Sequence, residues 1–214
     1  MEQEFEKIKK DIIHYYTDSG HNFDHTERVY NLAVKLAESE KNIDMKVVKL
    51  SALLHDIARH KEISGSGICH AEEGAKMAKD ILTKENYHKK IIDHVCECIK
   101  THRFSKRLKP ETKEAAILQD ADRLDALGAM VIARVFDRCG SKGRPIYDPN
   151  IPPAKDIYDK EKARRTGINH FKEKVFALKP ETFKTKLAQD IAKSRYDYVM
   201  DFVTRFEKEW RGEL

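Results

Sequence analysis

The chain has 214 residues and a formal net charge of +5, and 36% of its residues are charged against 40% hydrophobic. That length supports one sizeable core, while no uncharged apolar run is long enough to span a membrane. Basic and acidic residues are interspersed, so no nucleic-acid-binding arm is predicted. The first ten residues, MEQEFEKIKK, lack the apolar region of a signal peptide, which favours a cytoplasmic location.

The four cysteines are Cys69, Cys96, Cys98 and Cys139. The pair Cys96 and Cys98 lacks the second half of a zinc site, and four cysteines give no disulfide framework for a chain of this size. Buried free thiols are therefore expected, in keeping with a reducing compartment.

Nearly every segment has helical periodicity, and no strand alternation or internal repeat is evident. The first predicted helix covers Glu2 to Thr17 and ends before Ser19-Gly20. Asp24 is predicted to cap the second helix. A third helix begins after Asn42 with Asp44 as its cap, and its segment VVKLSALLHDIA is apolar on almost every face. Such a helix is expected in the middle of a bundle.

The later elements alternate between helices and one long loop. Helices are predicted at His70–Leu82, Tyr87–Arg103 and Glu111–Cys139, the last bent near Gly128, and two closing helices at Asp159–Leu178 and Thr182–Trp210. Residues 140–156 contain four prolines and two glycines, which predicts a loop that is either functional or mobile. No composition shift marks a second core, so the sequence predicts an all-α fold with residues 1–214 as a single domain.

The pair His55-Asp56 ends the predicted buried helix, directly after Leu53-Leu54. Burial of a carboxylate beside an imidazole is costly unless a metal or a partner compensates for it. A coordinated cation removes that cost, because both side chains then become ligands. A buried His–Asp hydrogen bond is the alternative interpretation of this pair taken alone.

His25 lies in the first turn of the second predicted helix. Val29, Leu32 and Leu36 follow it at i+4, i+7 and i+11, so His25 is predicted to project from the core-facing stripe. A polar ring in that position needs a partner.

Asp122 lies on another apolar helix face, four residues after Leu118, with Asp125 three residues later on the same face. Asp120 points away from them by about 160° on a helical wheel and is expected to be solvated or to support the ligands. Two carboxylates on a core face again favour a bound cation.

Read in chain order, His25, His55-Asp56 and Asp122 form the set H…HD…D, which resembles the HD-domain metal-dependent phosphohydrolases. The motifs DHTERV at 24–29, LLHDI at 53–57 and LQDADRLDALG at 118–128 are similar to those of bacterial and archaeal single-domain HD hydrolases, and INHFKEK at 168–174 is similar to their C-terminal signature. The resemblance spans nearly the full chain.

The resemblance implies an HD-type helical bundle with a metal-binding core at about 20–130 and C-terminal helices at about 157–212 that complete it. It also implies a divalent metal at the centre, namely Mn²⁺, Mg²⁺, Co²⁺, Ni²⁺ or Fe²⁺. The predicted ligands are His25, His55, Asp56 and Asp122.

Two further histidines extend the predicted site. His70 shares a helix face with Ile81, and His102 shares one with Val95, whereas His94 has polar neighbours and is expected to be exposed. In two-metal members of the family, intervening histidines bind the second metal. In one-metal members, comparable residues contact phosphate or act as acids, and the sequence leaves both roles open.

The resemblance further implies cationic residues for a phosphorylated substrate. The predicted substrate-binding residues are Arg28, Lys61, His170 and Lys174. Arg123, although next to Asp122, is expected at the surface. Tyr147 in the proline-rich loop is a candidate for stacking on a base.

The predicted activity is hydrolysis of a nucleotide or a related phosphate ester or anhydride, including triphosphates with release of pyrophosphate. A bound divalent metal acidifies water and polarises a phosphoryl oxygen. Asp56 or Asp125 is expected to orient the water, and His70 or His102 to protonate the leaving oxygen.

Other functions fit the same residues. They are a binuclear phosphodiesterase for cyclic or signalling nucleotides, a catalytically weak HD module that senses a ligand and, more remotely, a di-iron oxygenase. The predicted partner is a small phosphorylated molecule, neither nucleic acid nor membrane is expected, and a homodimer is compatible with the sequence.

Overall fold

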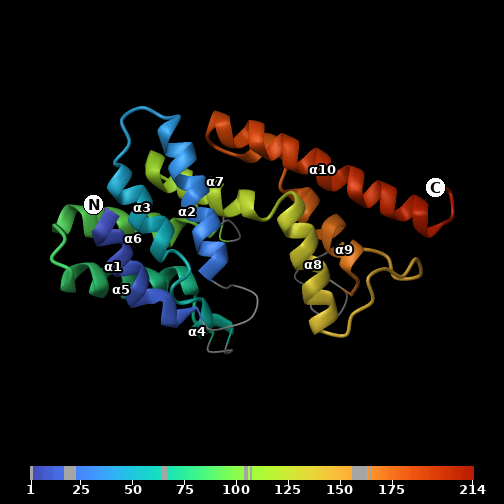
Figure 1. Cartoon of the computed structure of the whole chain (residues 1–214), viewed down its shortest axis with the longest axis horizontal. Coiled ribbons are helices and arrows are strands. Elements are labelled where there is room, and N and C mark those ends of the chain that lie inside the picture. Colours follow the sequence, from blue (N-terminus) through green and yellow to red (C-terminus); the bar gives the residue numbers. More distant parts are fainter. Residues whose placement is uncertain are drawn as a thin grey trace. The chain divides into compact units, whose positions relative to one another are not determined.

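The computed structural model describes residues 2–16, 23–63, 67–103, 106, 108–155, 163 and 165–214 (Figure 1). These residues form helices joined by turns and contain no β-strand, which confirms the predicted all-α class. The chain divides into two compact units, Met1–Asp122 and Arg123–Leu214. The prediction that they make up a single domain stays a prediction.

The N-terminal unit is built around one buried helix. It contains α1 (Glu2–Ile12), a 3-10 turn (Ile13–Tyr15), α2 (Phe23–Glu38), α3 (Met45–Leu54), α4 (Arg59–Ile63), α5 (His70–Lys84), α6 (Lys89–Thr101) and most of α7 (Lys113–Asp125). Helix α3 contacts both α2 and α6, and α5 packs against α6. From Val47 to Leu54 only Lys49 is not fully buried, so α3 is the central helix that its apolar sequence predicts.

Hydrogen bonds at both ends of this core fix the position of α7. The Asp44 carboxylate accepts from the backbone amides two and three residues later, which confirms the predicted cap of α3. The backbone amide of Asp44 donates to Glu114 of α7 at 2.8 Å. The Gln119 side chain donates to the carbonyl of Thr101 at the end of α6, at 3.1 Å. These bonds place the end of α7 that carries Asp122.

The C-terminal unit packs its helices through aromatic rings. It contains α8 (Ala129–Ser141), α9 (Gly167–Glu173), 3-10 turns at Val175–Ala177 and Pro180–Thr182, and α10 (Lys186–Trp210). The rings of Phe136, Phe171 and Phe202 have centroids 5.9–6.1 Å apart. A Cβ at Gly167 would lie 3.0 Å from the Phe136 ring and 3.1 Å from the carbonyl of Ile146. Glycine therefore permits the close approach of α9 to α8.

Several predicted boundaries shift in the N-terminal half. Helix α1 ends at Ile12 and continues as a 3-10 turn, whereas the helix was expected to reach Thr17, which lies outside the described residues together with Ser19-Gly20. Helix α2 begins at Phe23, so Asp24 is in its first turn and is not its cap. The short helix α4 was not predicted, because five residues are too few to show a periodic pattern.

The predicted bend near Gly128 is confirmed as a break between α7 and α8, where Gly128 has a φ of +82°. The predicted loop 140–156 contains the end of α8 at Ser141 and then turns without helix as far as residue 155. The helix predicted at Asp159–Leu178 is shorter in the described residues, where α9 covers Gly167–Glu173. The last helix begins at Lys186, four residues after its predicted start at Thr182.

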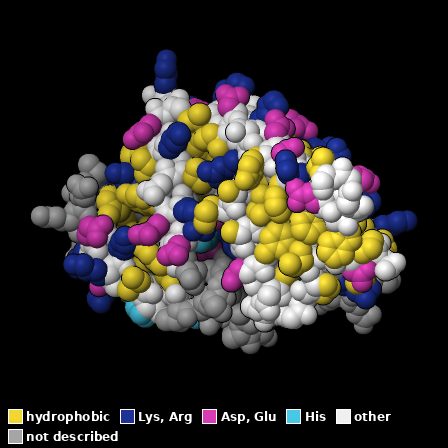
Figure 2. Space-filling view, turned by 45° about the vertical axis from the view of Figure 1, so that its right-hand side comes forward, with side chains coloured by type: hydrophobic (Ala, Val, Ile, Leu, Met, Phe, Trp, Pro, Cys, Tyr) yellow, Lys and Arg dark blue, Asp and Glu magenta, His cyan; other side chains and the backbone are white. Residues whose placement is uncertain are grey.

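Apolar side chains reach the surface of the C-terminal unit, on the right-hand side of Figure 2. The exposed ones in this unit include Ile146, Tyr198 and Trp210. Among the described residues, no helix has the length and apolar character that crossing a membrane requires.

Candidate metal centre

The four predicted ligands all lie at helix ends in the N-terminal unit. His25 is in the first turn of α2, His55 is the C-cap of α3 with Asp56 next to it, and Asp122 is in the last turn of α7. His25, His55 and Asp56 are buried, and the Asp122 side chain keeps 28% of its exposure. Local helix geometry therefore delivers two imidazoles and two carboxylates to one region.

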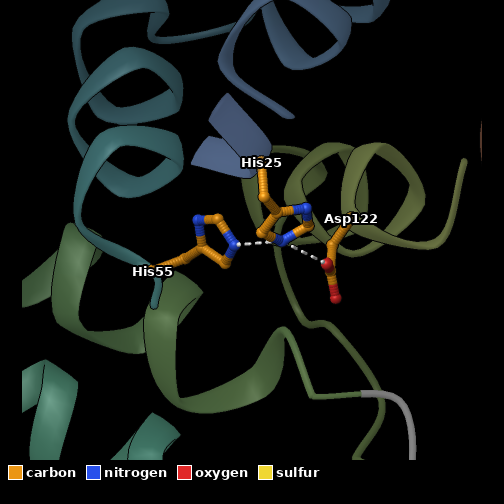
Figure 3. Close-up of side chains that lie close together, drawn as sticks. All are labelled: His25, His55 and Asp122. Carbon is orange, nitrogen blue, oxygen red and sulfur yellow. Dashed lines mark hydrogen bonds and ion pairs between the residues drawn. The ribbon is translucent and has the colours of Figure 1, made fainter. Parts of the chain in front are cut away.

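Three of these side chains form a first trio, His25, His55 and Asp122 (Figure 3). The Nε2 atoms of His25 and His55 are 3.3 Å apart, and His25 Nε2 is 3.4 Å from Asp122 Oδ1. One nitrogen or oxygen of each residue lies within 4.8 Å of the others, which is close enough for all three to bind one ion.

Asp56, His70 and His102 form a second trio. Asp56 Oδ1 lies 3.4 Å from His70 Nε2 and 3.7 Å from His102 Nε2. The two histidine Nε2 atoms are 3.3 Å apart. All three side chains are buried, and His70 and His102 are the two further histidines that the sequence singled out.

The Asp56 carboxylate faces both trios. While Oδ1 points to His70 and His102, Oδ2 lies 3.8 Å from His25 Nε2 and 3.9 Å from His55 Nε2. The structure thus brings the four predicted ligands together with His70 and His102, with Asp56 between the two trios, and their binding of metal stays a prediction.

Hydrogen bonds on the far side of two imidazoles fix which nitrogen faces inward. His55 Nδ1 lies 2.8 Å from the carbonyl oxygen of Ala52, and His102 Nδ1 lies 2.6 Å from that of Ile99. A carbonyl oxygen only accepts, so each Nδ1 carries the hydrogen and each Nε2 presents a lone pair. Two such nitrogens beside two buried carboxylates form a cluster of electron-pair donors that fits a divalent cation.

Protonation states of four members of the cluster agree with metal binding, whereas, against the effect of burial, the nearby Asp56 carboxylate raises the pKa of His102. Burial lowers the pKa of His55, and burial also lowers the pKa of His70 to about 4. Burial by itself would raise the pKa of Asp56, but the surrounding histidines and an arginine hold it well below its usual range. The pKa of Asp122 is likewise depressed against burial, chiefly by His25. Neutral imidazoles and ionised carboxylates are the forms that bind metal.

Known proteins are similar to this chain in sequence and fold over nearly its whole length. Residues 22–127, which include both trios, match the HD domain family. An HD-superfamily hydrolase from Bacillus thuringiensis has a crystal structure that superposes with a TM-score of 0.77, at 33% identity and 98% coverage of both chains. The chain belongs to the HD-domain superfamily. It is a metal-dependent hydrolase of that superfamily.

A second relative is YpgQ from Bacillus subtilis, which is 32% identical over 97% of this chain and 94% of its own length. A crystal structure of YpgQ in complex with ADP superposes with a TM-score of 0.73, at 26% identity and with coverage of 97% of this chain and 95% of that one.

Residues that the sequence did not single out surround His70 in the HD centre. His70 Nδ1 is 2.7 Å from Glu62 Oε2 and 2.9 Å from the NH1 nitrogen of Arg59. Arg103 binds the other oxygen of Glu62 at 2.6 Å. Arg59 and Glu62 belong to α4, whose five residues carry no periodic signal, so only the contacts reveal their place beside the centre.

Of the four predicted substrate-binding residues, two lie in each unit. Arg28 is half-buried on α2, and Lys61 pairs with Glu73 at 2.7 Å. His170 is in α9 and Lys174 follows as its C-cap, so both belong to the C-terminal unit. Their roles stay predictions.

Asp125, the predicted partner of Asp122, is buried and belongs to the C-terminal unit. Its carboxylate accepts a hydrogen bond from Arg134 at 2.9 Å, and its backbone carbonyl accepts a second from the same guanidinium. The predicted catalytic role of Asp125 stays a prediction, and its recorded ion pair gives it a structural role between α7 and α8.

Two expectations about exposure were wrong, and a third is narrowed to one of its alternatives. His94 is half-buried and bonds Thr112 at 3.2 Å, because a polar helix face still meets the start of α7. Asp120 is fully buried, which excludes the solvated alternative, and its support of the ligands stays a prediction. Arg123 is buried with its guanidinium 4.1 Å from the Phe183 ring centroid, a stacking that needs a partner sixty residues away in the sequence.

The cysteines are free, as expected, but only three of them are buried. Cys69, next to His70, is partly exposed.

Proposed function

We propose that this HD enzyme hydrolyses a phosphate ester or anhydride of a nucleotide, including nucleoside triphosphates with release of pyrophosphate. The observation that carries the proposal is the pair of largely buried trios with Asp56 between them, one carboxylate oxygen toward each. The complex of YpgQ with ADP supports a nucleotide as the ligand class, since YpgQ is related over almost the full chain.

Each residue of the centre has a role in this proposal. His25, His55, Asp56 and Asp122 hold a divalent metal, which when bound supplies an acidified water and polarises a phosphoryl oxygen. Asp56 also orients the attacking water, because its two oxygens span the centre. As water attacks phosphorus and the bond to the leaving oxygen breaks, that oxygen needs a proton.

His102 is the favoured donor of that proton. Burial opposes the charged imidazole, but the Asp56 carboxylate, 3.7 Å from Nε2, raises the pKa of His102 above its ordinary value. His70, with a lowered pKa, stays neutral at a pH of about 7 and is better suited to bind a cation.

A binuclear phosphodiesterase is the second candidate. It is favoured by the two oxygens of Asp56, which each face a separate trio, since a carboxylate in that position can bridge two ions. Two metal ions per chain and preferential cleavage of phosphodiesters would select this activity over nucleotide anhydride hydrolysis.

The test is a screen for phosphate and pyrophosphate release over nucleoside mono-, di- and triphosphates and cyclic nucleotides, with Mn²⁺, Mg²⁺, Co²⁺ and Ni²⁺ each supplied in turn. His55→Ala and Asp56→Ala should abolish release, while His94→Ala, a half-buried histidine of the same unit outside both trios, should keep it. Circular dichroism checks that each variant is folded.

Full activity in both His55→Ala and Asp56→Ala would contradict the proposed centre. A wild-type chain that binds metal and nucleotide yet releases nothing across the panel would instead favour the ligand-sensing alternative.

A further inference from the structure

His70 differs from His55 and His102 in the hydrogen-bond partners of its Nδ1 atom, the ring nitrogen that faces away from the centre. The Nδ1 atoms of His55 and His102 donate to carbonyls three residues earlier in their own helices. His70 is the first residue of α5 and has no such recorded bond. Its Nδ1 lies instead between two side chains of α4, Glu62 at 2.7 Å and Arg59 at 2.9 Å, and the same Arg59 nitrogen is 3.3 Å from His70 Nε2.

These two neighbours demand opposite forms of the imidazole. An ionised carboxylate only accepts a hydrogen bond, and a guanidinium only donates one. If Nδ1 donates to Glu62, the neutral ring has its lone pair at Nε2, facing Asp56 and His102. If Nδ1 accepts from Arg59, the hydrogen moves to Nε2, and that nitrogen can no longer bind a cation.

The contacts around Glu62 decide between the two forms. Arg59 donates to Glu62 Oε2 at 2.9 Å, and Arg103 donates to Oε1 at 2.6 Å, so both oxygens of Glu62 are held in place. The carboxylate is also the nearer of the two neighbours of Nδ1. Arg59 therefore donates to Glu62, and Glu62 is the group that accepts the hydrogen bond from His70 Nδ1.

We propose that Glu62 is a positioning residue that holds His70 with its hydrogen on Nδ1, so that Nε2 presents a lone pair to the second trio. This rests on the proposed metal centre, because a lone pair at Nε2 is the form in which His70 can bind a cation or accept a proton. Arg103, which holds Glu62 in place, directly follows His102, the C-cap of α6.

The tautomer can be measured directly in the full-length chain labelled with ¹⁵N, freed of metal and kept at a pH of about 8.5, where histidines are ordinarily neutral. Long-range ¹H–¹⁵N correlation spectra identify which ring nitrogen carries the hydrogen. The His70 signals are assigned by their loss in His70→Gln. In the wild type, His70 is expected with hydrogen on Nδ1.

Glu62→Ala leaves Arg59 as the neighbour of Nδ1, so His70 is expected to change to the form with hydrogen on Nε2. Glu62→Gln keeps an amide oxygen that can accept from Nδ1 and should retain the wild-type form. Glu73→Ala, the matched control, removes a glutamate of α5 that pairs with Lys61 and has no recorded contact with His70. It should change nothing at His70.

His55 and His102 serve as internal controls, because their Nδ1 atoms bond backbone carbonyls and should keep their tautomers in every folded variant. A wild-type His70 with hydrogen on Nε2 would overturn the proposal without any variant. So would a His70 tautomer that is unchanged in a folded Glu62→Ala chain. The spectra are recorded without metal or substrate. A failure of the proposed nucleotide hydrolysis can therefore be distinguished from a failure of the proposed role of Glu62.

Discussion

At the scale of single residues, the centre depends most on Asp56. Each of its oxygens faces two histidine Nε2 atoms at 3.4–3.9 Å, whereas Asp122 belongs to the first trio and forms its ion pair with His25 at 3.4 Å. The two carboxylates are both ionised, because each pKa is depressed against burial. They differ in the number of histidines that each one faces.

This difference predicts unequal losses of metal. Asp56→Asn should lower Mn²⁺ affinity by more than tenfold for every ion bound, because its carboxylate serves both trios. Asp122→Asn should weaken only the ion at the first trio. Isothermal titration with Mn²⁺ measures both. Equal effects of the two substitutions would contradict the shared position of Asp56, and His94→Ala controls for loss of a nearby polar group.

The sequence predicts those residues of the centre whose position follows from helical phase. His25 precedes a stripe of core residues, and the structure buries it as expected. Glu62 could not be found in this way, because its contact with His70 depends on how the short helix α4 folds back onto α5. Arg123 was misplaced for a similar reason, since Phe183 and Thr182 cover it from a distant segment.

At the scale of elements, the sequence predicts the helices that have a strong periodic pattern, but it predicts their ends less accurately. The apolar run of α3 identifies it as the central helix, and Asp44 marks its start. Helix α1 ends early because Ile13–Tyr15 winds into a 3-10 turn, after which the Tyr16 hydroxyl donates to the carbonyl of Leu53. That bond joins α1 to α3, and a tertiary contact of this kind has no signature in the local sequence.

The break between α7 and α8 gives a test of backbone conformation. Gly128 has φ +82° and ψ −158°, a region that is essentially restricted to glycine. Gly128→Ala should decrease the free energy of unfolding by about 1–3 kcal/mol. The added Cβ also lies 3.1 Å from the Arg195 side chain, which donates to the carbonyl of Leu124 and would have to shift.

Gly140→Ala is the matched control for that substitution. Gly140 is in α8, and nothing lies within 4 Å of an added Cβ. Alanine is favoured over glycine in a helix, so the substitution should be neutral or stabilising by up to about 1 kcal/mol. Thermal unfolding followed by circular dichroism compares the pair, and a Gly128→Ala chain as stable as Gly140→Ala would argue against strain at the break.

At the scale of the whole molecule, the metal centre and the C-terminal signature belong to different units. Both trios lie within Met1–Asp122, whereas the motif INHFKEK at 168–174 lies in the unit Arg123–Leu214. The match to the HD domain family ends at residue 127, but HD relatives cover almost the entire chain. The predicted substrate-binding residues His170 and Lys174 lie in this second unit.

Substrate binding by His170 and Lys174 predicts a loss of substrate affinity without a loss of metal when either is replaced. His170→Ala and Lys174→Ala should each raise KM about tenfold for the nucleotide that is hydrolysed fastest, since a lost charge-assisted bond to phosphate is worth about 1.4 kcal/mol. Mn²⁺ affinity should be unchanged, because both trios lie in the other unit. Lys172→Ala, which removes an exposed ion pair with Glu207 in the same segment, is the control. If KM stays at the wild-type value in both variants, these two residues of the C-terminal unit do not bind the phosphate. The substrate contacts would then come from the N-terminal unit, where Arg28 and Lys61 are the next residues to replace.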